Sequence, residues 1–405
     1  MGERACEHGQ EVVYLLGAGA SVDAGLPTAS GLTQITLDLL NTAYGPRAET
    51  VALNHVIAAL QMAEVRLGGE ANVLPDIEQV VRAVELLGDR LNVELSPFVA
   101  SWDPYISVVE TMDRQRTWND LENLGARSDR ASLALAVAGV PEHSRYQDLH
   151  LLLLRALKDA LKLPDDADLS YLDPLVSVGR ERQQTIATLN YDLTVETDAA
   201  RIGVPLSTGL DRWRSTGELV WPGSGVRLLK LHGSIDWDRS VEFPDAAVLG
   251  LPQEVPGPDG EDALPFVVYG RREKLRAQGP FLDLRADLVA SLRSARYLVV
   301  VGYGFHDDHV NEVIRRWINT GADRRLIVVD PNFPTNWAHA DGFPYFLLGG
   351  LWKQEGALLS AISQSRLGVV RQTAAEALPR LCAGPQELEA VIAETVTASE
   401  GESSD

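Results

Sequence analysis

The ten residues 12–21 constrain the fold of this chain more than any other stretch. They read Val-Val-Tyr-Leu-Leu-Gly-Ala-Gly-Ala-Ser, an apolar run rich in β-branched and aromatic side chains that is followed at once by two glycines one residue apart. The run predicts a buried strand, and a helical pattern begins soon after it. A strand, a glycine turn and a helix in this order allow backbone N–H groups and a helix N-terminus to approach a pyrophosphate.

On its own this glycine turn has two interpretations. A dinucleotide fingerprint, G-x-G-x-x-G, needs a third glycine at position 22, which is Val22 here, and the next glycine is Gly25. The turn therefore either binds a nucleotide, where a Cβ atom would block the close approach, or only connects a strand to a helix. The motifs further along the chain favour the nucleotide site.

Charge and cysteine content exclude several classes of protein. The 405 residues include 57 acidic and 36 basic side chains, a net charge of −21, and such a surface repels nucleic acid and anionic membranes. The two cysteines, Cys6 and Cys382, exclude a disulfide framework and a four-cysteine zinc site within one chain. The sequence starts with no apolar signal segment and contains no apolar run long enough to span a membrane, so we expect a soluble, cytoplasmic protein.

Four more buried strands are expected downstream, and each ends in small or polar residues. They lie at residues 184–189, 226–231, 297–301 and 326–329, and they run into Asn-Tyr-Asp, His-Gly-Ser, Gly-Tyr-Gly and Asp-Pro-Asn. Such endings are typical of an open, mostly parallel α/β sheet whose ligand lies beyond the carboxyl ends of the strands. Together with residues 12–16, these strands predict a Rossmann-like α/β fold with one shared site.

The expected domains follow from the places where helical and strand patterns change. Residues 1–40 and 180–350 are expected to form the Rossmann-like domain, interrupted by a large helical insertion at 41–179. Residues 351–398 are expected to form C-terminal helices, and the polar, acidic residues 399–405 a disordered tail. Residues 244–260 are rich in proline, glycine and acidic side chains and predict an exposed loop.

Four side chains at the predicted strand ends are candidates for chemistry. His232 can act as a general base near neutral pH, although a single histidine is more often a surface or core residue. Asn190 can orient a water or a ribose hydroxyl without titrating, and Asp192 can accept from a carboxamide or hydroxyl; both types are also common in turns and caps. Asp330 is placed to bind a ribose diol, as acidic residues do in dinucleotide folds.

The cluster His306-Asp307-Asp308-His309 offers ligands for a metal, yet its context favours the start of a helix. It precedes apolar residues at helical spacing, and acidic side chains are favoured in the first turn of a helix by its dipole. We therefore predict no metal site at this cluster.

In their order along the chain, these motifs resemble those of the sirtuin family, and most of all the bacterial sirtuin-like branch found in anti-phage defence systems. They are Gly-Ala-Gly-Ala-Ser at 17–21 with Gly-Leu-Pro at 25–27, Thr-Leu-Asn-Tyr-Asp at 188–192, Leu-His-Gly at 231–233, Val-Gly-Tyr-Gly at 301–304 and Val-Asp at 329–330. The resemblance extends from residue 12 to residue 332 as scattered short motifs, with the helical insertion between the first two.

The resemblance implies an NAD site, with NAD as the substrate. The family pattern would assign the pyrophosphate to Gly17, Ala18, Gly19 and Ser21, the nicotinamide ribose to Asn190, the carboxamide to Asp192, catalysis to His232, and the adenosine half to Gly302, Gly304 and Asp330. We expect Asn190 to position a water, and His232 to take a proton from that water or from a ribose hydroxyl.

Two departures from the protein-deacylating sirtuins bear on the reaction. Those enzymes are similar in carrying a four-cysteine zinc ribbon after the histidine motif, whereas this chain has no cysteine between Cys6 and Cys382. They carry Asp-Phe-Arg after Gly-Leu-Pro, where this chain has Thr-Ala-Ser at 28–30. The resemblance therefore implies an NAD hydrolase without zinc that depletes NAD in anti-phage defence. A non-catalytic NAD- or ADP-ribose-binding regulatory subunit and a protein ADP-ribosyltransferase or deacylase are the alternatives.

A cytosolic NAD hydrolase has to be controlled, and this sequence shows no separate sensor domain. We expect a homo-oligomer, or a partner such as a HerA-like ATPase or another operon-encoded defence protein, and no direct binding of nucleic acid or membrane. The expectations of a homo-oligomer and of a partner protein follow from the resemblance and from the need for control. The activating trigger, and whether the ADP-ribose product is linear or cyclic, are left open by the sequence.

Overall fold

The computed structural model describes residues 11–44, 48–69, 73–89, 145–242, 253–257, 264–268, 279–333 and 364–402. The predictions for residues 90–144, for most of 244–260 and for residues 351–363 of the expected C-terminal helices lie outside these residues. The chain divides into two compact units, one formed by Met1–Thr28 with Leu161–Asp405 and the other by Ala29–Ala160. The domain bounds expected from the sequence stay a prediction.

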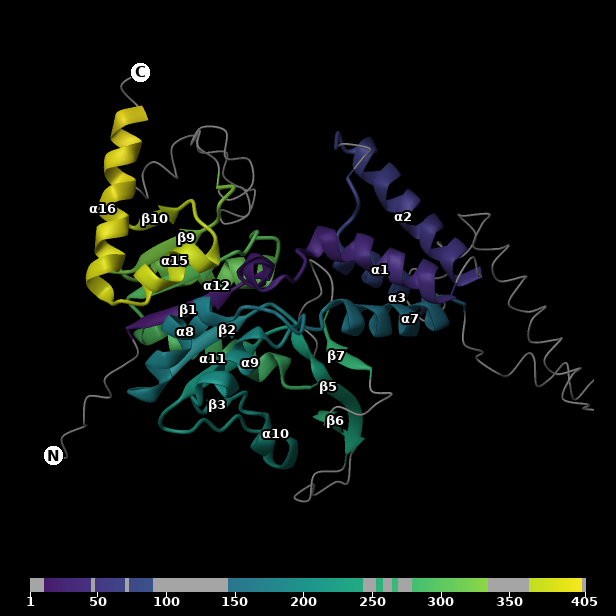
Figure 1. The fold of residues 1–405 in the computed structure, drawn as a ribbon, viewed down its shortest axis with the longest axis horizontal. Coiled ribbons are helices and arrows are strands. Elements are labelled where there is room, and N and C mark those ends of the chain that lie inside the picture. The colour runs from purple at the N-terminus through teal and green to yellow at the C-terminus, as the bar shows by residue number, and fades with distance from the viewer. Residues whose placement is uncertain are drawn as a thin grey trace, which may run out of the picture. The chain divides into compact units, whose positions relative to one another are not determined.

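A seven-stranded sheet with the order β10-β9-β8-β1-β2-β4-β3 forms the centre of the first unit (Figure 1). All of its strand pairs are parallel. Its strands are β1 (Val12–Leu16), β2 (Gln184–Thr188), β3 (Leu206–Ser207), β4 (Val226–Lys230), β8 (Tyr297–Val301), β9 (Arg325–Val329) and β10 (Leu367–Val370). The five strands predicted from the sequence and the α/β fold class are confirmed.

The strand order reverses between β1 and β8. From β1 the chain builds the sheet in one direction through β2 and β4, then returns to the other side of β1 and continues through β8, β9 and β10. This is the connectivity of a Rossmann-like sheet, in which ligands bind outside the carboxyl ends of the strands at the point of reversal.

Successive strand residues supply two hydrophobic cores, one on each face of the sheet, because side chains alternate along a strand. In β1, Val13 and Leu15 belong to one core, whereas Val12, Tyr14 and Leu16 belong to the other. The first core is covered by α10 (Leu210–Thr216), α11 (Phe281–Ser294) and α12 (Asp308–Asn319), and the second by α8 (Asp173–Ser177), α9 (Thr194–Ile202), α15 (Ala374–Leu381) and α16 (Pro385–Glu402).

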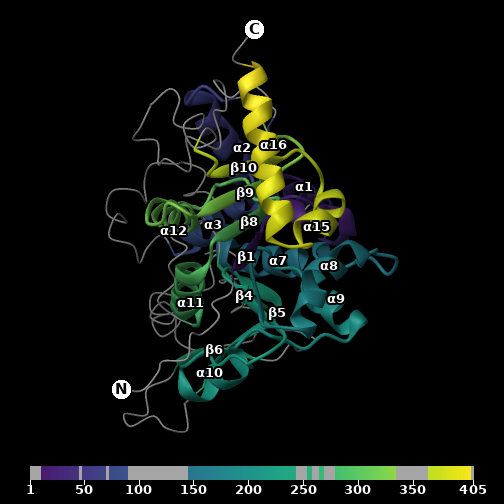
Figure 2. The same ribbon diagram turned by 90° about the vertical axis from the view of Figure 1, so that its left-hand side faces the viewer.

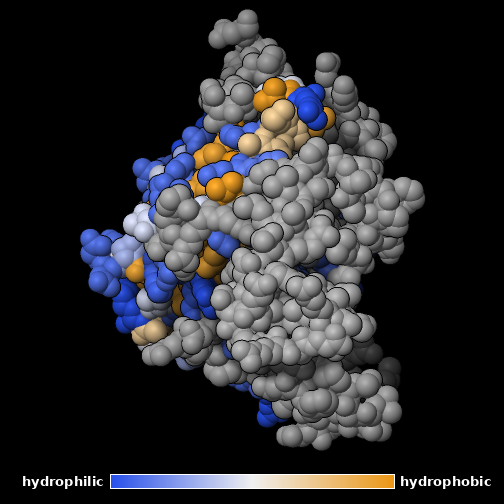
Figure 3. All heavy atoms as spheres, turned by 90° about the vertical axis from the view of Figure 1, so that its right-hand side faces the viewer, coloured by the Kyte–Doolittle hydropathy of each residue, from blue (hydrophilic) through white to orange (hydrophobic). Residues whose placement is uncertain are grey.

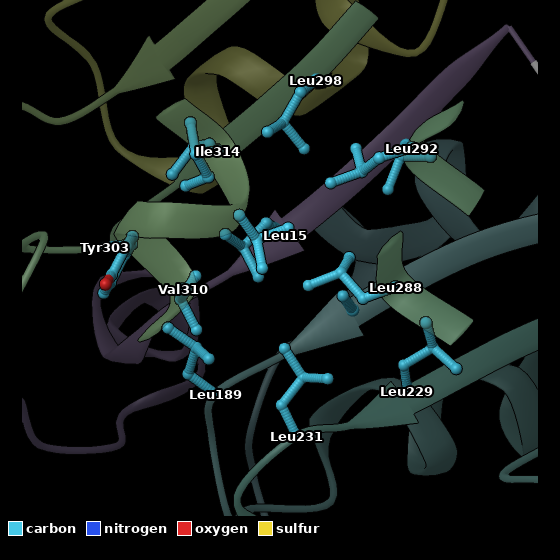
Figure 4. Packing of buried hydrophobic residues seen from close by; sticks show 14 of the residues in the cluster. Leu15, Leu189, Leu229, Leu231, Leu288, Leu292, Leu298, Tyr303, Val310 and Ile314 are labelled. Carbon is cyan, nitrogen blue, oxygen red and sulfur yellow. The ribbon is translucent and has the colours of Figure 1, made fainter. Parts of the chain in front are cut away.

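The two layers of helices are seen on opposite sides of the sheet in Figure 2, with α11 and α12 on one side and α15 and α16 on the other. Figure 4 shows Leu15 of β1 in the middle of the first core, between Leu288 of α11 and Ile314 of α12. Packing in the two cores therefore determines where these helices lie relative to the carboxyl edge of the sheet.

The sequence interpretation missed several strands. Edge strand β10 lies in the segment predicted to be helical, and a second, antiparallel sheet has the order β6-β5-β7. Its strands are β5 (Gly233–Glu242), β6 (Gln253–Gly257) and β7 (Pro265–Val267). The prediction of a loop across residues 244–260 is wrong for β6, because pairing with β5 supplies its hydrogen bonds despite its proline and glycine.

The described part of the second unit is helical, with α1 (Ala29–Tyr44), α2 (Ala48–Arg66), α3 (Ile77–Gly88) and α7 (Arg145–Ala160). Helix α7 packs against each of the other three. Its buried side chains Tyr146, Leu149, Leu153 and Leu157 recur every three or four residues and form one apolar stripe. A capping box between Asp76 and Gln79 fixes the start of α3.

The C-terminal helix and the surface complete the described structure. Helix α16 runs through Glu402, four residues into the segment predicted as a disordered tail, and residues 403–405 lie outside the described part. Figure 3 shows apolar side chains among hydrophilic ones on one face of the molecule. Among the described helices, none combines the length and the apolar character needed to cross a membrane.

Candidate functional site

The parallel registers bring the ends of five strands into one row at the carboxyl edge of the sheet. Leu16 pairs with both Thr188 and Val301, Val301 pairs with Val329, and Thr188 pairs with Lys230. The residues that directly follow these strands, in order across the sheet, are Asp330, Gly302, Gly17, Leu189 and Leu231. At about 4.8 Å between neighbouring strands, this row is about 19 Å long.

Asn190 and His232 lie at matching positions on neighbouring strands. Each comes two residues after the paired residues Thr188 and Lys230, and the backbone N–H of Leu231 donates to the Thr188 carbonyl at 3.0 Å. Asn190 is 9% exposed and His232 2% exposed. Asn190 and His232 therefore occupy neighbouring positions along the carboxyl edge, one and two strands from the glycine turn of β1.

The glycines at the strand reversal are required by contact between two backbone turns. The Gly19 N–H donates to the Gly302 carbonyl at 2.9 Å. A Cβ atom on Gly17 would lie 2.6 Å from the Gly302 carbonyl oxygen, and one on Gly302 would lie 2.4 Å from the Ala20 nitrogen. Gly302 also has a φ of 63°. Glycine at these positions is thus explained by the packing of the β1 and β8 turns against each other, whether or not a ligand is bound.

Asn190 is fixed by both hydrogens of its side-chain amide. Its Nδ2 donates to the Gly17 carbonyl at 2.9 Å and to Ser21 Oγ at 3.0 Å. Because a backbone carbonyl can only accept, the NH₂ group must face Gly17 and the amide orientation is determined. Within the described residues Asn190 Oδ1 accepts no hydrogen bond and is not fully buried. The site therefore presents a rigid, uncharged acceptor.

Ser21 and Asp192 extend the hydrogen bonds of Asn190 into a longer chain of contacts. Ser21 Oγ donates to Asp192 Oδ2 at 2.8 Å. Asp192 Oδ1 accepts from the backbone N–H of Thr194 at 3.0 Å and from its hydroxyl at 2.7 Å, at the start of α9. Both oxygens of the buried Asp192 carboxylate are thus engaged within the protein, so this side chain holds the 190–194 turn in place.

Lys230 is a further residue of the site that the sequence interpretation missed. Its side chain is fully buried, and Nζ donates to the Asp192 carbonyl at 2.6 Å and to Glu196 Oε1 at 2.7 Å. Burial raises the pKa of Glu196, and the neighbouring Lys230 ammonium opposes that rise. The only signal in the sequence was a lysine directly after two leucines at the end of a predicted strand.

His232 pairs with an acid that is 75 residues away in the sequence, because its Nε2 lies 2.8 Å from Asp307 Oδ2. Asp307 is also the N-cap of α12, and its Oδ1 accepts from the backbone N–H groups of His309 and Val310. The prediction of a polar helix start is confirmed, but the pairing with His232 was missed. Among the residues that the structure describes, no group of three or more potential ligands is placed to hold a metal ion.

The remaining predicted residues lie in the same row but outside this hydrogen-bonded network. Asp330 Oδ1 accepts from the Asn332 N–H at 2.9 Å, which is the contact of a turn residue. Gly304 is exposed beside His306, and Ala18 is half-buried at the start of the short helix η1 (Ala18–Ala24). The structure thus brings Gly17, Ser21, Asn190 and Asp192 into direct contact, and it leaves Asp330 at the far end of the row.

One family model matches part of the chain. Residues 184–342 match the family model described as the SIR2-like domain, and this segment contains Asn190, His232 and Asp307. The match supports the sirtuin-like resemblance for that segment, which is less than half of the chain. No protein of curated function matches the sequence.

Solved Sir2 structures align with the chain only distantly. One from a study of the mechanism and regulation of Sir2 enzymes has 12% identity and a TM-score of 0.37, and it covers 95% of this chain and 93% of its own. A mutant Sir2 homologue in complex with ADP-ribose has 12% identity and a TM-score of 0.35, with 96% and 94% covered. Sir2Tm bound to a propionylated peptide has 11% identity and a TM-score of 0.32, with 93% of each chain covered.

Proposed function

We propose that the carboxyl edge of the sheet binds NAD, and that the chain hydrolyses the nicotinamide–ribose bond to release nicotinamide and ADP-ribose. The proposal depends on one observation above all: the open acceptor Asn190 Oδ1 and the paired histidine His232 lie at matching positions beside the strand reversal. In Rossmann-like folds a dinucleotide binds across this point of reversal. The SIR2-like match of residues 184–342 supports NAD as the substrate.

The chemistry of this bond suits the groups in the site. Nicotinamide leaves as a neutral molecule with the electron pair of the broken C–N bond, so no acid is needed to protonate it. The transition state resembles an oxocarbenium ion, as in other glycosyl transfers. The protein has to hold the ribose and a water molecule and to accept one proton as the new C–O bond forms.

Asn190 and His232 can supply these functions. As an uncharged acceptor fixed by two hydrogen bonds, Asn190 Oδ1 can hold the hydrogen of a water or a ribose hydroxyl without competing for its proton. His232 accepts the proton from that water or hydroxyl, which is the function of a general base near neutral pH. Gly17, Ala18, Gly19 and Ser21 at the pyrophosphate, Asp192 at the carboxamide, and Gly302, Gly304 and Asp330 at the adenosine half are part of the same proposal.

Product analysis tests the proposal directly. The purified chain is incubated with NAD, and nicotinamide, ADP-ribose and any ADP-ribosylated protein are separated by liquid chromatography and identified by mass spectrometry. Stoichiometric nicotinamide and free ADP-ribose are expected. Labelled protein in place of free ADP-ribose would indicate a transferase. Binding of NAD without nicotinamide release, under every assembly state tested, would indicate a regulatory binder; either result contradicts the proposed reaction.

We further propose that this activity depletes NAD during anti-phage defence and is controlled by assembly, either of copies of this chain or with a HerA-like ATPase or another defence partner. The support is the sequence resemblance and the damage that an uncontrolled NAD hydrolase would do to its own cell. Expression in a bacterial host, with NAD and plaque formation followed after infection, tests this role. A fall in plaque number that persists when His232 is replaced by alanine would contradict it.

A further inference from the structure

The carboxylate of Asp307 is shared between a helix terminus and an imidazole. Its Oδ1 accepts from the backbone N–H of His309 at 2.8 Å and of Val310 at 3.2 Å, at the first turn of α12. Its Oδ2 lies 2.8 Å from His232 Nε2. Asp307 and His232 are each 2% exposed, so the pair lies away from bulk water, where electrostatic interactions are stronger.

The loop before Asp307 is itself fixed. The Tyr303 hydroxyl accepts from the Asp307 N–H at 3.0 Å and donates to Asn311 Oδ1 at 2.9 Å. Asn311 Nδ2 donates to the Phe305 carbonyl at 2.7 Å, and Phe305 has a φ of 55°, a conformation that is uncommon for a residue other than glycine. A strained residue held by a buried side chain indicates that the position of this loop is determined by its surroundings.

Core packing determines where the start of α12 lies relative to the strand ends. Val310 follows the cap of α12 and packs in the same core as Leu189 and Leu231, the residues that precede Asn190 and His232 (Figure 4). A cavity of about 20 Å³, lined by His232, Asp307 and side chains of α11 and α12, adjoins the pair. This volume holds about one water molecule. The packing of α12 against the strand ends therefore holds the Asp307 carboxylate against His232 in the absence of a ligand.

This geometry selects one form of the imidazole. A carboxylate can only accept, so the hydrogen between the two residues is on Nε2 and the lone pair of the neutral ring is on Nδ1. The same carboxylate stabilises the imidazolium that forms when Nδ1 takes up a proton. This arrangement corresponds to the acid of a Ser-His-Asp triad, which orients the histidine without itself becoming protonated.

We infer that Asp307 is a positioning residue for the proposed NAD cleavage: it fixes His232 with Nδ1 as the proton acceptor, while it also caps α12. The inference rests on the proposed function for its catalytic consequence. The tautomer itself is a property of the protein without substrate.

Asp307→Asn separates the two functions of this side chain. Asparagine caps a helix about as well as aspartate, so Oδ1 still accepts from the first turn of α12. Its NH₂ group then replaces Oδ2 and can only donate, which moves the lone pair of His232 to Nε2 and the hydrogen to Nδ1. Asp308→Asn is the matched control, since Asp308 is the exposed neighbouring acid in the same turn.

Two measurements test the inference. Long-range ¹H–¹⁵N correlation of the histidine rings, with His232 assigned from the signal lost in His232→Gln, reports the tautomer of the full chain. Steady-state nicotinamide release reports kcat and KM. We expect the Nε2–H tautomer in the parent and in Asp308→Asn, and the Nδ1–H tautomer in Asp307→Asn. We expect kcat of Asp307→Asn to fall by about 10²–10⁴-fold, with KM little changed.

The outcomes distinguish this inference from the proposed function. The Nδ1–H tautomer in the parent protein would overturn the inference without any variant, and so would a folded Asp307→Asn with the reversed tautomer and parental kcat. If the parent shows the Nε2–H tautomer but releases no nicotinamide from NAD, the proposed function fails while the assigned positioning of His232 is retained.

Discussion

His232 and Asn190 are held by different contacts, and the difference determines what a substitution at each should do. His232 Nε2 lies against the Asp307 carboxylate, whereas both amide hydrogens of Asn190 are donated to Gly17 and Ser21 beside β1. Removing the imidazole should therefore affect chemistry most, and removing the amide should affect both chemistry and stability.

For His232→Ala we expect nicotinamide release from NAD to fall by about 10²–10⁴-fold, the usual contribution of a general base. His306→Ala is the control, because His306 is an exposed histidine outside the pair. Circular dichroism checks that both variants are folded. Turnover of His232→Ala at the parental rate would exclude His232 as the base.

For Asn190→Ala we expect loss of NAD cleavage together with a decrease in the free energy of unfolding of about 1–3 kcal/mol, because the buried partners Gly17 O and Ser21 Oγ lose a donor. Ser21→Ala removes only one of these contacts and leaves Asn190 Oδ1 in place, so its activity should be reduced less. Urea unfolding and nicotinamide release measure the two effects. Equal losses of activity in both variants would contradict the function assigned to Asn190 Oδ1.

At the scale of elements, the contact between the β1 and β8 turns determines the shape of the carboxyl edge. Gly302→Ala should destabilise the protein more than Gly203→Ala, although both glycines have a positive φ, 63° and 69°. A Cβ atom at Gly302 would lie 2.4 Å from a backbone nitrogen, whereas at Gly203 it would meet nothing within 4 Å. The shared conformational cost is about 1–3 kcal/mol, and the clash at Gly302 adds to it. Similar free energies of unfolding for the two variants would show that the turns are not packed in this way.

The elements were predictable from the sequence where a long apolar run met a change of composition. Strands β1, β2, β4, β8 and β9 each have five residues and end in polar or turn-forming residues, so pattern alone located them. Strands β3 and β10, with two and four residues, are too short for a pattern and form because an existing strand offers its edge. The pairing of His232 with Asp307 was not predictable, because it depends on how β4 and α12 pack and not on any local motif.

The glycine turn shows how one pattern can have two physical causes. The sequence offers two explanations of Gly17 and Gly19, a pyrophosphate that needs close access to the backbone or a tight connection from strand to helix. In the folded chain the same glycines are required by the approach of Gly302. The residue type therefore predicted a tight turn after β1, and only the register of β1 with β8 showed what the glycines contact.

For the molecule as a whole, a buried carboxylate on α9 makes stability depend on pH. Burial raises the pKa of Asp198 from its ordinary value of 3.8 to about 6, even though Arg201 beside it opposes the shift. The folded state then binds the proton more tightly than the unfolded state, so this contribution to stability is present below about pH 4 and is lost as the pH rises through about 6. Asp198→Asn should flatten the dependence of the unfolding free energy on pH in this window. If the unfolding free energy of Asp198→Asn depended on pH as steeply as that of the parent, the assignment of this pH dependence to Asp198 would be wrong.

The most direct measurement of the central claim is a crystal structure of His232→Ala with NAD, because this variant should bind the dinucleotide and turn it over slowly. We expect NAD to lie across the carboxyl edge at the reversal between β1 and β8, with a hydroxyl of the nicotinamide ribose, or a water beside it, within hydrogen-bond distance of Asn190 Oδ1. NAD bound elsewhere on the chain, or a nicotinamide ribose on the far side of β8 from Asn190, would contradict the account.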